Sequence, residues 1–97
     1  MENESLILVA QFCTHHDVEP SFIVSLHEFG LVTIVELEEE RYLSADEISV
    51  VEKMIRLHYG LGINLEGIDA ISHLLRQIEA LQQELRSVKN RLDSFAP

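Results

Sequence analysis

The segment VTIVELEEERYLSADE, residues 32–47, contains the sharpest change of pattern in the chain. Val32, Ile34 and Glu36 alternate with Thr33, Val35 and Leu37, which predicts a β-strand with at least one buried face. Glu36 is the first of four glutamates within five residues, and RYL, residues 41–43, then returns as a second short strand. The segment therefore predicts a β-hairpin whose tip is acidic, with the carboxylates supplied by Glu36, Glu38, Glu39 and Glu40.

A helix is predicted immediately after the hairpin. The SADE sequence at residues 44–47 matches a capping box, in which Ser44 accepts a hydrogen bond from the Glu47 N–H and Glu47 reaches back to the Ser44 N–H. Gly60 and Gly62 end the helix. One face of it is expected to carry Ile48, Val51, Met54, Ile55 and His58.

Two short helices are predicted before the hairpin. The run SLILV, residues 5–9, is consistent with a strand, and VAQFCTHHD then forms a helix that offers Ala10, Phe12 and Cys13 to a core. In VEPSFIVSLHEFG, residues 18–30, Pro20 suits a first helical turn and Gly30 suits the left-handed position after the last one. Its apolar face comprises Phe22, Ile23, Leu26 and Phe29. The tight connection HHDVEP between these helices favours a helix-turn-helix.

The C-terminal third has the pattern of a coiled coil. Asn64 is a suitable N-cap for a helix from Leu65 to about Ser94. Apolar residues occupy every a and d position of almost four heptads: Ile71, Leu74, Ile78, Leu81, Leu85, Val88, Leu92 and Phe95. A stripe of this length exceeds what so small a domain can cover, so we expect these residues to form a homodimer interface. The alternative is that the helix docks back on its own domain.

These elements define the expected fold and domain organisation. The chain is mainly α, with a winged helix-turn-helix over residues 1–62 that includes a small β-hairpin wing, and a long coiled-coil dimerisation helix over residues 63–97. At 97 residues the two parts should form one compact unit rather than independent domains.

The charge of the chain is concentrated in its first part. The formal net charge is −10, and residues 1–40 contain nine acidic side chains and no lysine or arginine. Such a surface repels phosphate backbones and anionic membranes and attracts basic proteins, so we expect neither a nucleic-acid nor a membrane partner. The N-terminal sequence lacks the basic region of a secretory signal, and one cysteine fits a reducing compartment. A cytoplasmic location is expected.

No motif in the sequence supports catalysis or metal binding. The chain has no HExxH, no CxxC and no phosphate-binding glycine loop, and His15 and His16 are adjacent, so they cannot easily share an ion. Cys13 is expected to be a core residue, because no neighbouring cation would lower its pKa. We expect no catalytic residues, no metal site and no cofactor.

The order of elements resembles the MerR-type winged-helix regulators, whose second half is similar to RYLSADEISVVEKMIRLHYGLGINLEGIDAI here. The resemblance is closer to one branch, the CbpM-type chaperone modulators. Similarity extends through VAQFCTHHDVEPSFIVSLHEFGLV, including Phe12, Cys13 and His15, and through the acidic wing, so that it covers almost the whole chain.

This resemblance implies a specific partner. CbpM-type proteins bind the J-domain of a DnaJ-like co-chaperone of the CbpA type and inhibit its stimulation of a DnaK-type chaperone. An acidic modulator can cover the basic helix with which a J-domain docks on that chaperone. The residues expected to contact the J-domain are acidic and lie in the first half of the chain: Asp17, Glu19, Glu28, Glu36, Glu38, Glu39 and Glu40. The alternative function is a MerR-like DNA-binding transcriptional regulator, for which the second helix and wing lack the usual cations.

Overall fold

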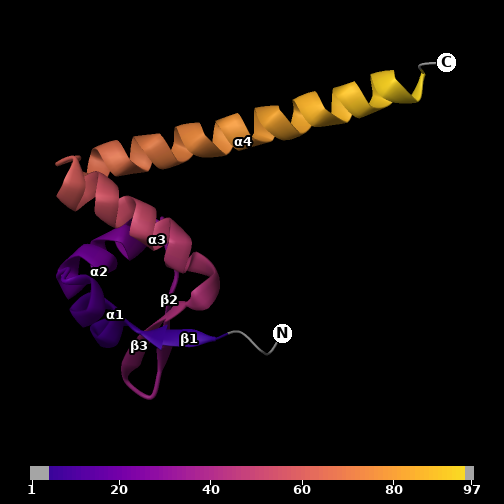
Figure 1. Ribbon diagram of the computed structural model, residues 1–97. Helices are drawn as coiled ribbons and strands as arrows, with labels where there is room; N and C mark the ends of the chain where they lie inside the picture. Colours follow the sequence, from indigo (N-terminus) through magenta and orange to yellow (C-terminus); the bar gives the residue numbers. More distant parts are fainter. Residues whose placement is uncertain (1–4, 96–97) are drawn as a thin grey trace.

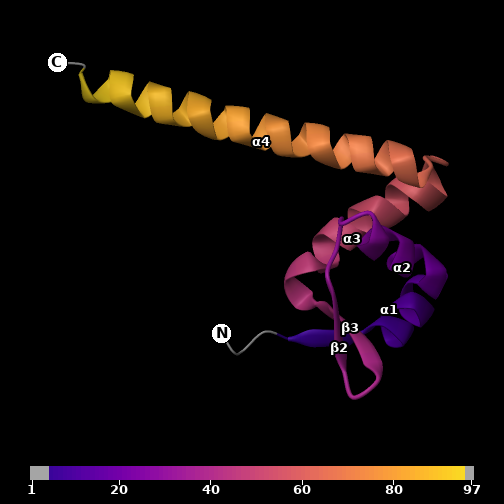
Figure 2. The same ribbon diagram turned by 180° about the vertical axis from the view of Figure 1, so that it is seen from behind.

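A computed structural model describes residues 5–95 as a small helical domain from which one long helix projects (Figures 1 and 2). The elements follow in the order β1 (Leu6–Leu8), α1 (Val9–His16), α2 (Pro20–Glu28), β2 (Ile34–Leu37), β3 (Glu40–Ser44), η1 (Ala45–Glu47), α3 (Ile48–Ile55), η2 (Arg56–Gly60) and α4 (Leu65–Ser94). The mainly α fold predicted from the sequence is confirmed, and so are the helix-turn-helix, the hairpin and the extent of the last helix.

The predicted hairpin is part of a larger sheet. β2 and β3 pair antiparallel, with Glu36 opposite Arg41 and Leu37 opposite Glu40, as the sequence predicts. β1 then pairs with the free edge of β3, placing Leu8 opposite Tyr42, so the sheet order is β1-β3-β2. The wing is therefore three-stranded rather than two-stranded, and its central strand β3 contributes the fully buried Leu43 to the core.

The core lies between the helices and one face of this sheet. Its fully buried side chains come from four elements: Ile23 and Leu26 on α2, Leu43 on β3, Val51 on α3 and Ile68 on α4. Two predicted core positions are wrong, because Ala10 is exposed on α1 and Phe29, which follows α2, is 38% exposed. On α1, Val9 is buried alongside Phe12 and Cys13.

The N-terminal caps differ in how well the sequence predicted them. The Asn64 side chain accepts a hydrogen bond of 2.8 Å from the Gly67 N–H, as predicted for the start of α4. The capping box is wrong, because Ser44 Oγ accepts from the Asp46 N–H at 3.3 Å. Glu47 instead accepts from the Thr33 N–H at 3.0 Å, so its carboxylate links the start of α3 to the chain entering β2.

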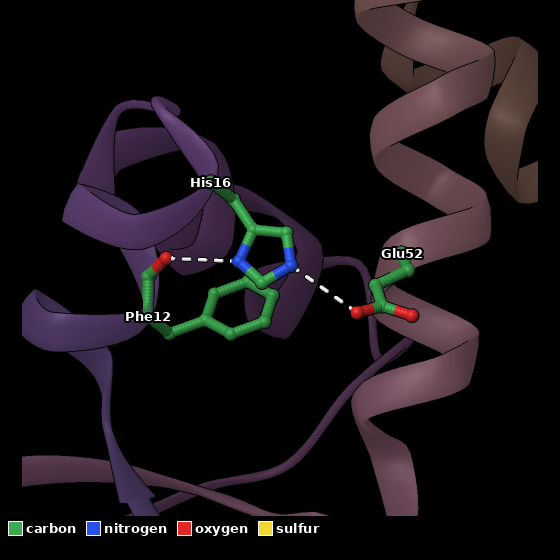
Figure 3. A network of polar contacts seen from close by, with 3 residues as sticks. All are labelled: Phe12, His16 and Glu52. Atoms are coloured by element: carbon green, nitrogen blue, oxygen red, sulfur yellow. Dashed lines mark hydrogen bonds and ion pairs between the residues drawn. The ribbon is translucent and has the colours of Figure 1, made fainter.

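A histidine connects α1 to α3 (Figure 3). The His16 ring lies between two acceptors, the Phe12 carbonyl oxygen at 3.1 Å from Nδ1 and a Glu52 carboxylate oxygen at 3.1 Å from Nε2, and it stacks on the Phe12 ring with centroids 4.1 Å apart. A neutral imidazole can donate to only one of the two acceptors, whereas an imidazolium donates to both. The contact joins α1 to α3 through two residues, His16 and Glu52, that are 36 positions apart in sequence.

A second histidine fixes the corner at which α4 leaves the domain. His58 Nδ1 donates to the Ile63 carbonyl oxygen at 2.8 Å, and the same ring stacks on Phe22 of α2 with centroids 4.7 Å apart. Gly62 takes the left-handed conformation, at φ 72°, that the turn between these two residues requires. The half-buried His58 and the core residue Phe22 therefore help to set the direction of α4.

Cys13 is expected to react slowly with thiol reagents in the folded protein. The residue is 3% exposed, and burial raises the pKa of its thiol, which disfavours the reactive thiolate. At pH 8 we expect modification by Ellman's reagent to be slower than that of a free thiol by roughly two orders of magnitude, and to become complete once denaturant is added. Fast modification without denaturant would show that the Cys13 side chain is accessible to solvent in the folded protein.

Candidate functional site

A shallow recess lies between α2 and the hairpin, and its lining includes two glutamates, Glu28 and Glu36. The recess has a volume of about 310 Å³. Val24, His27 and Glu28 come from one face of α2, because they are three and four residues apart. Ile34 and Glu36 share one face of β2, because they are two residues apart, and the last lining residue is Arg41 of β3.

The recess carries two carboxylates against one guanidinium. The register of β2 and β3 places Arg41 opposite Glu36, and their Nε and Oε2 atoms lie 3.7 Å apart. Both side chains are more than half exposed, so the pair adds little stability, but it does offset the single cation of the hairpin. Glu28 forms no ion pair with any other residue that the structure describes. The recess therefore presents a net negative charge to a partner.

His27 is a residue of the recess that the sequence analysis did not select. Its Nδ1 lies 3.1 Å from the Val32 carbonyl oxygen, to which it donates, and this hydrogen bond joins the end of α2 to the segment before β2. In the neutral form this leaves Nε2 as an acceptor. The spacing of His27 from Val24 could have indicated a shared helix face, whereas the opposing strand could not be inferred from local sequence.

The tip of the hairpin holds two glutamates in an unusual backbone conformation. Glu38 and Glu39 have φ values of 51° and 68°, and they connect β2 and β3 as a two-residue turn. Left-handed conformations at both positions are typical of a type I′ turn, for which Asn-Gly is the preferred sequence. A side chain with a Cβ is disfavoured there, so the sequence keeps two exposed carboxylates at the tip at some cost in stability.

Replacing the tip by Glu38→Asn with Glu39→Gly is expected to raise the free energy of unfolding by about 1–2 kcal/mol, because it removes the left-handed strain and a like-charge repulsion. Chemical denaturation monitored by circular dichroism measures this change. The matched control is Glu38→Gln with Glu39→Gln, which removes the same charges and keeps the strain. Equal stability of the two variants would contradict the strained-turn interpretation.

The structure divides the seven predicted contact residues into three groups. Glu28 and Glu36 meet in the recess, and Glu38, Glu39 and Glu40 extend from it along the hairpin tip. Asp17 and Glu19 lie in the turn before α2, whereas Glu28 is at the other end of that helix, about 12 Å away along its axis. There the backbone N–H of Glu19 donates to the Tyr59 hydroxyl at 3.4 Å. Asp17 and Glu19 therefore form a separate acidic region.

The predicted dimerisation residues form a continuous exposed stripe. Beyond Ser72 every described residue of α4 is exposed, and the stripe includes Leu81 at 63%, Leu92 at 65% and Phe95 at 83% exposure. Ile71, at the start of the stripe, is half-buried. The alternative in which α4 docks back on its own domain is wrong, because α4 projects away from the domain in both views (Figures 1 and 2). Large apolar stripes of this kind mark association surfaces.

Within residues 5–95 no three histidine, cysteine or acidic side chains are grouped so that they could hold a metal ion. None of the helices described in that range combines the length and the apolar composition needed to cross a bilayer. On α2 and the hairpin, the surface that a winged helix turns toward DNA, Arg41 is the one lysine or arginine.

The chain is similar to one protein family and to a group of named bacterial proteins. Residues 7–90 match the model of a family described as MerR HTH family regulatory protein. The chaperone modulatory proteins CbpM of Escherichia coli O1:K1, of strain S88 and of strain E24377A are each 27% identical to this chain over 88 residues, covering 90% of this chain and 87% of the relative. No solved structure matches the chain.

Proposed function

The chain belongs to the MerR HTH family of regulatory proteins, and on this premise we propose that it is a chaperone modulator that binds the basic J-domain of a DnaJ-like co-chaperone of the CbpA type. One observation carries the proposal: the α2 and hairpin surface combines an acidic recess with an acidic tip and has Arg41 as its one lysine or arginine, already paired with Glu36. The relatives' name, chaperone modulatory protein, supports the same class of function.

The mechanism we propose is competition for a basic helix. A J-domain uses positive charges on one helix to dock on a DnaK-type chaperone. Glu28 and Glu36 line a recess into which a lysine or arginine side chain fits, and Glu38, Glu39 and Glu40 extend the negative surface beyond it. A J-domain bound here has its cations covered, and it no longer stimulates the chaperone. The opposite charges also accelerate association and reject acidic partners.

Self-association is the second part of the proposal. The stripe from Ile71 to Phe95 pairs with the same stripe of a second copy in an antiparallel coiled coil, the orientation that the resemblance to MerR-type regulators favours. At 1.5 Å per residue, the 30 residues of α4 span about 45 Å, so an antiparallel pair holds the two acidic surfaces at opposite ends of the dimer. Each dimer then offers two J-domain sites.

Calorimetric titration against a purified CbpA-type J-domain tests the proposal. Binding is expected in about 50 mM salt and should weaken by about tenfold or more in about 500 mM salt, because screening shortens the reach of surface charges. The absence of binding at low salt would overturn the proposed function.

The alternative function is DNA-binding regulation, which the helix-turn-helix and the family description favour. A duplex would place phosphates against the carboxylates of α2 and the hairpin, and like charges at that range repel. We therefore expect no shift of duplex DNA in a gel at low salt, conditions under which any DNA-binding protein shows some sequence-independent affinity. A shifted band would favour the alternative.

A further inference from the structure

His27 brings a neutral hydrogen-bond acceptor to the recess between α2 and the hairpin. Its Nδ1 lies 3.1 Å from the Val32 carbonyl oxygen, and because a carbonyl only accepts, Nδ1 carries the proton of the neutral ring. Nε2 is then left with a lone pair, and within residues 5–95 it has no hydrogen-bond partner. The residue is exposed, so both water and a partner can reach this nitrogen.

We propose that His27 is a partner-binding residue of the recess and that its protonation releases the partner. Lysine and arginine side chains have hydrogen-bond donors and no acceptor, so they can bond to Nε2 of the neutral ring and not to the imidazolium, in which both nitrogens donate. The inference rests on the proposed function and deepens it, because it makes J-domain binding depend on pH in the range where histidine changes charge.

The charges around His27 give its protonation a large local effect. Glu28 follows it on α2, and Glu36 on β2 lines the same recess. Arg41 on β3 also lines the recess, and from η1 Glu47 binds the backbone one residue beyond the carbonyl that His27 binds. The recess therefore holds two carboxylates against one guanidinium while His27 is neutral. An imidazolium makes the count two against two, and the local attraction for a basic partner is lost.

Protonation of His27 leaves the fold in place. Nδ1 donates to the Val32 carbonyl oxygen in both states of the ring, so the link between α2 and the segment before β2 is kept. Glutamate side chains ordinarily titrate about two pH units below histidine, so mildly acidic solution changes histidines and few carboxylates. The switch therefore acts on partner binding rather than on folding.

Calorimetric titration against a purified CbpA-type J-domain at two pH values tests the inference. In about 50 mM salt, binding is expected to be about tenfold weaker at about pH 5.5 than at about pH 7.5. Histidines of the partner also titrate in this range, so the comparison uses variants of this chain. His27→Gln has a neutral amide at both pH values and should remove most of the difference. The matched control His15→Gln removes an exposed histidine of α1, outside the recess, and should keep the full difference.

A fixed positive charge at position 27 gives a second comparison. His27→Lys should bind about tenfold more weakly than His27→Gln at about pH 7.5, because its ammonium group has no acceptor and adds one cation to the recess. Both replacements alter the group that binds the Val32 carbonyl oxygen, so thermal melting of each variant checks that the domain is folded.

The outcomes separate this inference from the proposed function. Equal binding of the wild-type chain at both pH values, or a His27→Gln variant that keeps the full pH difference, overturns the inference and leaves the proposed J-domain binding intact. Equal binding of the His27→Gln and His27→Lys variants at about pH 7.5 also overturns it. If the wild-type chain does not bind at about pH 7.5, the proposed function is overturned, and the inference with it.

Discussion

Leu81→Asp combined with Leu85→Asp is expected to abolish the proposed self-association and leave a monomer. Both side chains lie at the centre of the proposed interface and are more than 60% exposed in the single chain, so the double change removes apolar contacts between copies without entering the domain core. An antiparallel pair would bury four carboxylates side by side. We expect the dissociation constant to rise at least about 100-fold, or about 3 kcal/mol.

Light scattering across a range of protein concentrations measures this change, and circular dichroism follows the helix. The far half of α4 has no support from its own domain, so dissociation should also lower the helical signal. The matched control is Gln83→Asp with Ser87→Asp, which adds the same charge at two outer positions of the heptad and should leave the dimer intact. Persistence of the dimer in the Leu81 and Leu85 variant would refute the interface.

Reversing the charges at the hairpin tip is expected to weaken the proposed J-domain binding strongly. The triple variant Glu38→Lys, Glu39→Lys and Glu40→Lys replaces three attractive charges by three repulsive ones around the recess. These groups are exposed, so each contributes modestly, but together they should weaken binding about 100-fold or more at low salt. The same titration calorimetry measures the loss, and thermal melting should show a folded domain.

A charge-matched variant distinguishes the tip from the net charge of the chain. Glu66→Lys, Asp69→Lys and Glu84→Lys changes the total charge by the same amount, but all three positions are on α4, away from the recess. Binding should fall only slightly, through the weaker long-range attraction. If both triple variants bind equally, the tip is not the contact.

The elements of this fold could be predicted wherever the determining interactions are local. Asn64 caps α4 through a residue three positions later, and Pro20 occupies the first turn of α2, as their sequence contexts indicated. The capping box at Ser44 failed because Glu47 bonds the distant Thr33 N–H instead. The pairing of β1 with β3 was likewise missed, because it joins strands more than thirty residues apart.

The acidic character of the candidate site could be predicted from the sequence, but its shape could not. The concentration of carboxylates in the first forty residues is a property of the sequence, and it identified Glu28 and the four hairpin glutamates. The recess depends on how α2 packs against β2, which no local pattern specifies. The same packing placed His27 in the recess and separated Asp17 and Glu19 from it.

The α4 stripe shows a similar division between pattern and packing. The heptad pattern predicted the extent of the helix and its apolar face. The structure confirms the extent and shows that most of this face is exposed. A groove at the start of α4 combines residues of α3, η2 and α4, so it emerges only from the angle at which α4 leaves the domain. That angle depends on His58 and Phe22, which are 36 residues apart in the sequence.

The central claim is that the surface which a winged helix normally turns toward DNA here receives a basic protein helix. Titrating the isotopically labelled protein with a CbpA-type J-domain, and following backbone amide shifts by NMR, tests it most directly. The largest shifts are expected at Glu28 and at Glu36 to Arg41, with little change at Leu61 or Leu75. Shifts confined to α4 and its groove, with α2 and the hairpin unchanged, would contradict it.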